Sequence, residues 1–167
     1  MAERQLVVDK ERISYEGLFL VKDLIKLFYE WCSNKGYVPI ESKHSEVTKD
    51  DGKYVEIDFD PFKKVTDFSK NVFKIKLLCS NVTDIIMEQE GQKKKLNQGK
   101  IQLVFTGWLE TDYEHRWETK PIFYVIRTFF EKYVYGRFVA GYHTAIKKDL
   151  KELQDSYKAY LNLYKYV

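Results

Sequence analysis

Residues 100–110 read KIQLVFTGWLE, and this stretch decides the fold. Ile101, Leu103, Phe105 and Leu109 occupy odd-numbered positions within it. Because successive side chains of a strand point to opposite faces, these four apolar side chains share one face. Such one-sided alternation is typical of antiparallel strands that have one covered face and one solvated face. The stretch therefore predicts an antiparallel sheet with a single buried face.

The same period of two recurs towards the N-terminus, at residues 53–59 and 71–79. Apolar side chains alternate there with mostly polar ones: Val55, Ile57, Phe59, Phe73, Ile75, Leu77 and Cys79. An earlier strand is expected to end near Tyr15. Shorter strands are expected at residues 82–89 and 93–96, with turns at Glu90-Gly91 and at the Asn-Gln-Gly of residues 97–99. Short turns between successive strands predict a meander sheet of about five to six strands.

Helical periodicity flanks the predicted meander. Apolar residues recur at steps of three and four between Val21 and Cys32, and Gly36 is a good stop signal. A second helix is expected at residues 122–133 and a third from Ile146 to Tyr164. Gly136 and Gly141 are expected to interrupt the helical pattern between them. The sequence thus predicts a single α+β domain over residues 1–167. One N-terminal helix and two C-terminal helices are expected to cover one face of the antiparallel sheet.

Composition argues against several classes of protein. The chain carries 28 Lys and Arg against 25 Asp and Glu, so its net charge of +3 is too small to predict nucleic-acid binding by itself. Cys32 and Cys79 form no CxxC pair and lie in apolar runs, which predicts buried free thiols in a reducing compartment. The sequence has no apolar run long enough to span a membrane and no signal-peptide h-region, so we expect the protein to be located in the cytoplasm.

Sequence motifs predict neither a cofactor nor a metal. There is no HExxH, no P-loop, no GxGxxG and no GxSxG. The spacing of Glu56, Asp58 and Asp60 places three carboxylates on one face of a strand, which could hold a divalent cation or supply an acid/base pair. Even-numbered lysines on the next strand favour cross-strand charge pairing instead: Lys70, Lys74 and Lys76.

The densest group of reactive side chains is ETDYEHRWE, residues 110–118. Its charged side chains include Asp112, Glu114, His115 and Arg116. Because the segment follows the longest predicted strand and precedes Pro121, we interpret it as the corner from sheet to helices, fixed by ion pairs. An acid/base role for Asp112 or Glu114 with His115 is the alternative.

Basic residues gather at a predicted hairpin tip: Lys93, Lys94, Lys95 and Lys100. From Arg127 onward, eight Lys or Arg face four acids, with tyrosines between them. Basic residues and aromatic rings together could bind single-stranded nucleic acid, and more weakly a membrane surface. The favoured interpretation is a solvated helix face.

The apolar stripe of the last predicted helix becomes rich in tyrosine: Leu153, Tyr157, Tyr160 and Tyr164. An apolar stripe that continues to the end of the chain predicts docking on another surface. That surface is either this chain's own sheet or a partner. For the partner we expect a second copy, as a homo-oligomer, or another protein.

The sequence resembles a family of small uncharacterised archaeal proteins. The resembling stretches are residues 17–37, 62–68, 96–118 and 160–166, beginning with GLFLVKDLIKLFYEWCSNKGY and ending with YLNLYKY. This resemblance implies an archaeal cytoplasmic setting and no particular activity.

In element order the chain is also similar to helix-grip (START/SRPBCC-like) ligand-binding domains. It differs from their plan in its extra C-terminal helix and its single N-terminal helix. The similarity implies a cavity lined by inward strand residues: Phe73, Ile75, Leu103 and Phe105. We interpret the chain as a binding or self-assembling module rather than an enzyme. The alternatives are a small hydrophobic ligand or lipid binder and a single-stranded nucleic-acid binder.

Overall fold

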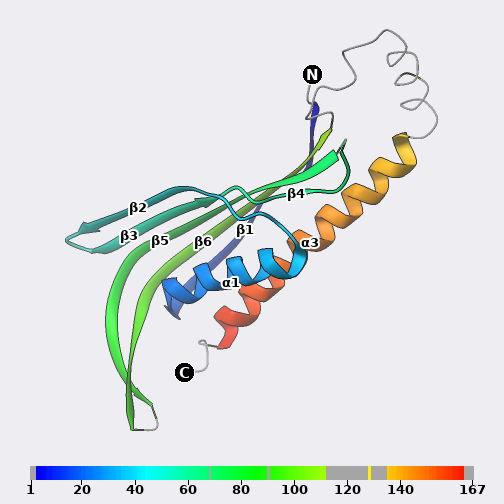
Figure 1. The fold of residues 1–167 in the computed structure, drawn as a ribbon. Coiled ribbons are helices and arrows are strands. Elements are labelled where there is room, and N and C mark those ends of the chain that lie inside the picture. The colour runs from blue at the N-terminus through cyan, green and yellow to red at the C-terminus, as the bar shows by residue number, and fades with distance from the viewer. Residues whose placement is uncertain (1–2, 68, 90, 112–127, 129–134, 164–167) are drawn as a thin grey trace.

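The computed structural model describes residues 3–67, 69–89, 91–111, 128 and 135–163. It confirms an α+β fold with an antiparallel sheet. The elements in chain order are β1 (Glu3–Phe19), α1 (Val21–Lys35), β2 (Glu41–Lys49), β3 (Gly52–Phe59), β4 (Phe62–Lys64), β5 (Ser69–Gln89), β6 (Gln92–Thr111) and α3 (Tyr135–Leu163) (Figure 1).

The sheet has the strand order β1-β6-β5-β3-β2, with β4 beside β5. The succession β2-β3-β5-β6 is the expected meander. β1 departs from it, because the first strand pairs antiparallel with the last and so forms the edge opposite β2. The chain therefore crosses from one edge of the sheet to the other between β1 and β2, and α1 forms this crossing.

The expected turn at residues 97–99 is wrong. β5 and β6 form one long hairpin whose last pair is Gln89 and Gln92, so the strands expected at 82–89 and 93–96 are its distal part. Asn81, with a φ of 53°, marks a bulge between Ser80 and Thr83. A Cβ on Gly99 would lie 2.9 Å from the carbonyl oxygen of Ser80, so glycine permits the close approach of the two strands there.

Beyond the bulge, the hairpin curves to the side of the sheet that carries the helices (Figure 1). A bulge bends a strand and increases its twist, which accounts for this curvature. We name the curved part, residues 82–89 and 91–98, the arm. The base of the arm lies next to the first turn of α1, as the hydrogen bond from Val21 N to Asn97 Oδ1 shows.

The helix boundaries are partly as expected. α1 ends at Lys35, followed by Gly36 in the left-handed conformation with a φ of 73°. The expected interruptions at Gly136 and Gly141 are wrong, because α3 runs unbroken through both. The structure thus has one N-terminal and one C-terminal helix within the residues that it describes. The helix expected at 122–133 lies outside them, apart from the helical Thr128.

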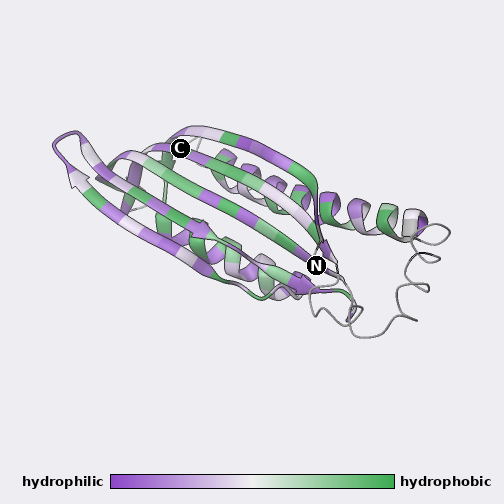
Figure 2. Ribbon diagram, turned by 90° about the horizontal axis from the view of Figure 1, so that it is seen from above, coloured by the Kyte–Doolittle hydropathy of each residue, from purple (hydrophilic) through white to green (hydrophobic). Residues whose placement is uncertain are grey.

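The core lies between the inner face of the sheet and the two helices. Figure 2 shows both helices on the same side of the sheet and the alternation of hydropathy along its strands. Aromatic rings fill the centre of this interface: Phe28 stacks on Phe59 at 4.1 Å between ring centroids, and Tyr37 stacks on Phe73 at 5.0 Å. The four side chains expected to line a cavity are fully buried in this closed core: Phe73, Ile75, Leu103 and Phe105.

Both cysteines are buried free thiols, as predicted. Burial raises the pKa of Cys32 and of Cys79 to about 12, so neither is a thiolate near neutral pH. Among the described residues, no helix combines the length and apolar character needed to cross a membrane.

Candidate functional site

A cleft opens at the end of the sheet where the arm curves past the start of α1. Its volume is about 530 Å³. We name it the inner cleft, because it lies on the side of the sheet that faces the helices. It is lined from four directions by Leu20, Val21, Lys22 and Ile25 at the start of α1, His44 and Glu46 of β2, Lys53 and Val55 of β3, and Val82, Asp84, Lys95 and Asn97 of the arm.

The floor of the inner cleft is apolar. Val55 and Val82 are 2% and 5% exposed and come from neighbouring strands, β3 and β5. Ile25 faces them from α1, where it is half-buried at the margin of the core. An apolar floor below a polar rim is the usual arrangement of small-molecule sites.

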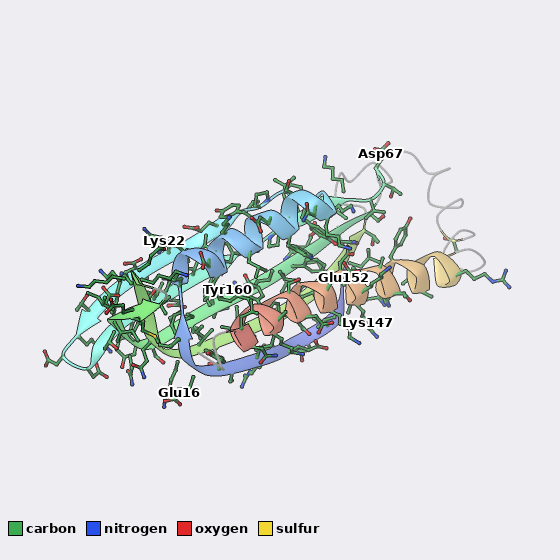
Figure 3. The ribbon with its side chains drawn as sticks, turned by 90° about the horizontal axis from the view of Figure 1, so that it is seen from below. Glu16, Lys22, Asp67, Lys147, Glu152 and Tyr160 are labelled. Atoms are coloured by element: carbon green, nitrogen blue, oxygen red, sulfur yellow. The ribbon has the colours of Figure 1, made fainter. Side chains whose placement is uncertain are left out.

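Hydrogen bonds hold the wall of the cleft in place. The backbone N–H of Leu20 donates to the hydroxyl oxygen of Tyr160 at 3.1 Å. The same hydroxyl donates to Asp23 Oδ2 at 3.2 Å, and the N–H of Val21 donates to Asn97 Oδ1 at 3.3 Å. Figure 3 shows Tyr160 between the two helices and Lys22 at the start of α1. The first turn of α1 is therefore attached both to α3 and to the arm.

The rim of the cleft is charged. Lys53 of β3 forms an ion pair with Glu46 of β2. Glu46 also contacts His44 on its own strand, where His44 Nε2 lies 3.2 Å from Glu46 Oε1. On the arm, Lys95 Nζ lies 2.9 Å from Asp84 Oδ2. The hydrogen bond from Lys53 lowers the pKa of Glu46, and that from Lys95 lowers the pKa of Asp84. These carboxylates are therefore ionised at neutral pH.

Among the titratable groups of the rim, His44 on β2 belongs to the residue type whose ordinary pKa lies closest to neutral pH. Its Nδ1 lies 3.0 Å from Glu41 Oε1, opposite the contact of its Nε2 with Glu46. Partial burial lowers the pKa of His44, but the hydrogen bonds and charges of Glu41 and Glu46 outweigh that effect and raise it. The imidazolium form is thus favoured by two carboxylates.

A second hollow lies on the opposite, outer face of the sheet. It has a volume of about 800 Å³ and is more open and more polar than the inner cleft. Two adjacent cross-strand rows form most of it: Ser14, Gln102, Leu78, Glu56 and Ser45, then Glu16, Lys100, Ser80, Tyr54 and Val47. We name it the outer trough. It has the greater volume but is less enclosed, so it has less capacity to exclude water from a ligand.

The carboxylates of β3 pair with lysines across the strands, as the favoured interpretation predicts. Asp58 lies opposite Lys76 in the register, and Lys76 Nζ is 3.1 Å from Glu56 Oε1. Lys43 of β2 also binds Glu56, at 2.6 Å. Lys70 binds the buried Glu110 instead, at 3.1 Å.

The predicted interaction residues fall in different places. Leu153 and Tyr157 are fully buried in the chain's own core, where the Tyr157 hydroxyl donates to the carbonyl oxygen of Leu24 at 3.2 Å. Lys93 and Lys94 are exposed at the tip of the arm. Lys95 and Lys100 take part in ion pairs with Asp84 and Glu16 respectively. Five predicted site residues lie outside the described part of the chain: Asp112, Glu114, His115, Arg116 and Tyr164.

Sequence reasoning missed the inner cleft. His44 occupies an exposed position on β2. The alternation of His44 and Glu46 with Ser45 was a signal that both side chains share one face. Only the register with β3 shows that this is the inner face, since His44 lies opposite Ile57 and Glu46 opposite Val55.

No group of three or more His, Cys, Asp or Glu in the described ranges is arranged to hold a metal ion. Comparison with known proteins gives no matching family model, no similar curated protein and no similar solved structure. Function must therefore be argued from the geometry of this chain.

Proposed function

We propose that this chain is a non-enzymatic binding protein for small amphipathic molecules, which it holds in the inner cleft. The observation that carries the proposal is the cleft of about 530 Å³ with an apolar floor between α1, the sheet and the arm. Pockets for small ligands have volumes of roughly 300–1,000 Å³ and combine mostly apolar walls with a few polar groups. The inner cleft has this size and this distribution of side chains.

The architecture adds support. A curved antiparallel sheet that packs on a long C-terminal helix is the plan of the helix-grip domains with which the sequence shares its element order (Figure 1). Fold-level likeness is an argument by analogy, so the cleft itself carries the proposal. Phe28, Phe59 and Phe73 are fully buried in the aromatic core at the middle of the sheet, which favours the end near the arm as the position of the ligand.

The test is a thermal-shift and calorimetric screen with small amphiphiles on two matched variants. Ile25→Trp places an indole ring in the inner cleft, and Val47→Trp places one in the outer trough. We expect binding by the wild-type chain and by Val47→Trp, and loss of binding by Ile25→Trp while it stays folded. Binding lost only in Val47→Trp would move the site to the outer trough, and absence of any ligand in the screen would refute the proposal.

Self-association through the C-terminal helix is the second candidate. It is favoured by Leu163, which is 71% exposed at the end of α3. Leu153 and Tyr157 contribute less to it than the sequence suggests, because their side chains already pack inside the chain. Light scattering of wild type and Leu163→Lys decides between the two: a concentration-dependent dimer that Leu163→Lys abolishes supports self-association, and a monomer at all concentrations excludes it.

A further inference from the structure

We propose that the ligand of the inner cleft carries an anionic head group, such as a carboxylate, and that Lys22 binds it. This inference rests on the proposed function and names the class of molecule. Its basis is the balance of charge around the rim. The lysines lining the cleft are Lys22, Lys53 and Lys95, and the carboxylates are Glu46 and Asp84.

The two carboxylates are each engaged by a lysine. Glu46 pairs with Lys53, and Asp84 pairs with Lys95 on the arm. Lys22 is left as the cleft lysine for which the described residues provide no ion pair. Its side chain belongs to the first turn of α1, which is attached to the arm through Val21 and Asn97 (Figure 3).

The position of Lys22 suits an amphipathic anion. The apolar floor formed by Ile25, Val55 and Val82 lies below the rim, so a ligand with its tail on this floor presents its head to the rim. A cationic head would meet Lys22 there together with the partial positive charge of the start of α1, and both would repel it. A neutral head would leave the charge of Lys22 unpaired. An anionic head pairs with it.

His44 strengthens the same preference. It lies on the opposite wall of the cleft, on β2, and two carboxylates hold it towards its protonated form. The charged groups around it are Glu41 and Glu46 on its own strand, Lys53 on β3, Lys22 on α1, and Asp84 and Lys95 on the arm. Protonation of His44 makes the rim more positive.

The experiment compares three probes that share one tail: octanoate, octanol and octyltrimethylammonium, titrated calorimetrically below their micellar concentrations. We expect octanoate to bind most tightly. Lys22→Gln is expected to lower the affinity for octanoate by about fivefold, as for the loss of a partly exposed ion pair. It is expected to leave the affinity for octanol unchanged. The matched control is Lys26→Gln, one turn further along α1, where Lys26 pairs with the exposed Glu30 at 3.5 Å. That variant is expected to bind octanoate like the wild type.

The outcomes separate this inference from the proposed function. If octanol or the ammonium probe binds as tightly as octanoate, the anionic head is wrong while the cleft still binds amphiphiles. An equal loss of octanoate affinity in Lys22→Gln and Lys26→Gln would show attraction by overall charge and overturn the role of Lys22. If none of the three probes binds, both the inference and the proposed function for such amphiphiles are refuted.

Discussion

The hydroxyl of Tyr160 accepts a hydrogen bond from the backbone N–H of Leu20, 3.1 Å away, and so joins the end of α3 to the start of α1. The first N–H groups of a helix lack partners within the helix, and Leu20, the N-cap residue, provides no side-chain hydrogen bond. Tyr160 therefore replaces solvent at the point where α1 forms the wall of the inner cleft. Stability and ligand binding should be linked through this side chain.

Tyr160→Phe tests that link. Tyr160→Phe removes two hydrogen bonds, from Leu20 N–H and to Asp23 Oδ2. We expect the free energy of unfolding to fall by about 1–3 kcal/mol, since each is worth roughly 1 kcal/mol or more, and the affinity for octanoate to fall with it. The control is Tyr142→Phe, which also alters a partly buried tyrosine of α3 next to the core. Urea unfolding and calorimetry measure the two quantities. Equal effects of both substitutions would contradict the role of Tyr160.

Gly99→Ala tests the origin of the arm. A methyl group there would lie 2.9 Å from the carbonyl oxygen of Ser80 and 3.1 Å from that of Asn81, both backbone atoms that cannot move without disturbing the bulge. We expect destabilisation of about 1–3 kcal/mol, as for overpacking. Gly141→Ala is the matched substitution: the space around Gly141 is open and α3 gains about 1 kcal/mol of helix propensity. If both variants shift the melting temperature upward, our account of the bulge fails.

The pH dependence of stability should contain a contribution from His44. Its pKa in the folded state is raised above the ordinary value of 6.5. A raised pKa adds stability that is complete below pH 6.5 and is lost as the pH rises through the folded-state pKa. Since His44 is partly exposed, the contribution should stay below about 1 kcal/mol. The difference in unfolding free energy between wild type and His44→Gln should shrink from acid to alkaline pH, and a constant difference would count against the two carboxylate contacts.

The thiols offer a test that is independent of the cleft. Burial raises the pKa of Cys32 and of Cys79 to about 12, so the reactive thiolate is scarce at pH 8. We expect both thiols of the native chain to react slowly with a disulfide reagent and rapidly in denaturant. Rapid labelling of either thiol under native conditions would show that this part of the core opens.

Much of the fold could be predicted from the sequence. Alternation at residues 53–59, 71–79 and 100–110 identified the inward side chains, and Gly36 identified the end of α1. The pairing of β1 with β6 could not be predicted. An alternating pattern shows which side chains of a strand share a face, but it does not show which other strand lies beside it. Gly99 was misread as a turn signal, since a glycine required by a close backbone approach looks the same in a sequence.

The candidate site was harder to predict than the fold. Its lining residues come from α1, β2, β3 and both strands of the arm, between Leu20 and Asn97, and have no common motif. The bend of the arm brings them together, and this bend follows from a bulge at Asn81, whose φ is 53°. Asparagine tolerates a positive φ, but it also does so in turns, so the residue type alone does not predict a bulge. The tyrosines of the last helix were recognisable, but an apolar stripe does not specify which surface it covers. In the structure, Tyr157 covers the chain's own core.

The central claim is that the inner cleft binds an amphipathic anion. The most direct measurement is a two-dimensional NMR titration of the labelled chain with octanoate. We predict saturable shifts of the signals of Val21, Ile25, Val55 and Val82, with little change at Val47, Leu78 and Gln102 of the outer trough. Shifts confined to the outer trough, or the absence of saturable shifts at the inner cleft, would contradict the claim.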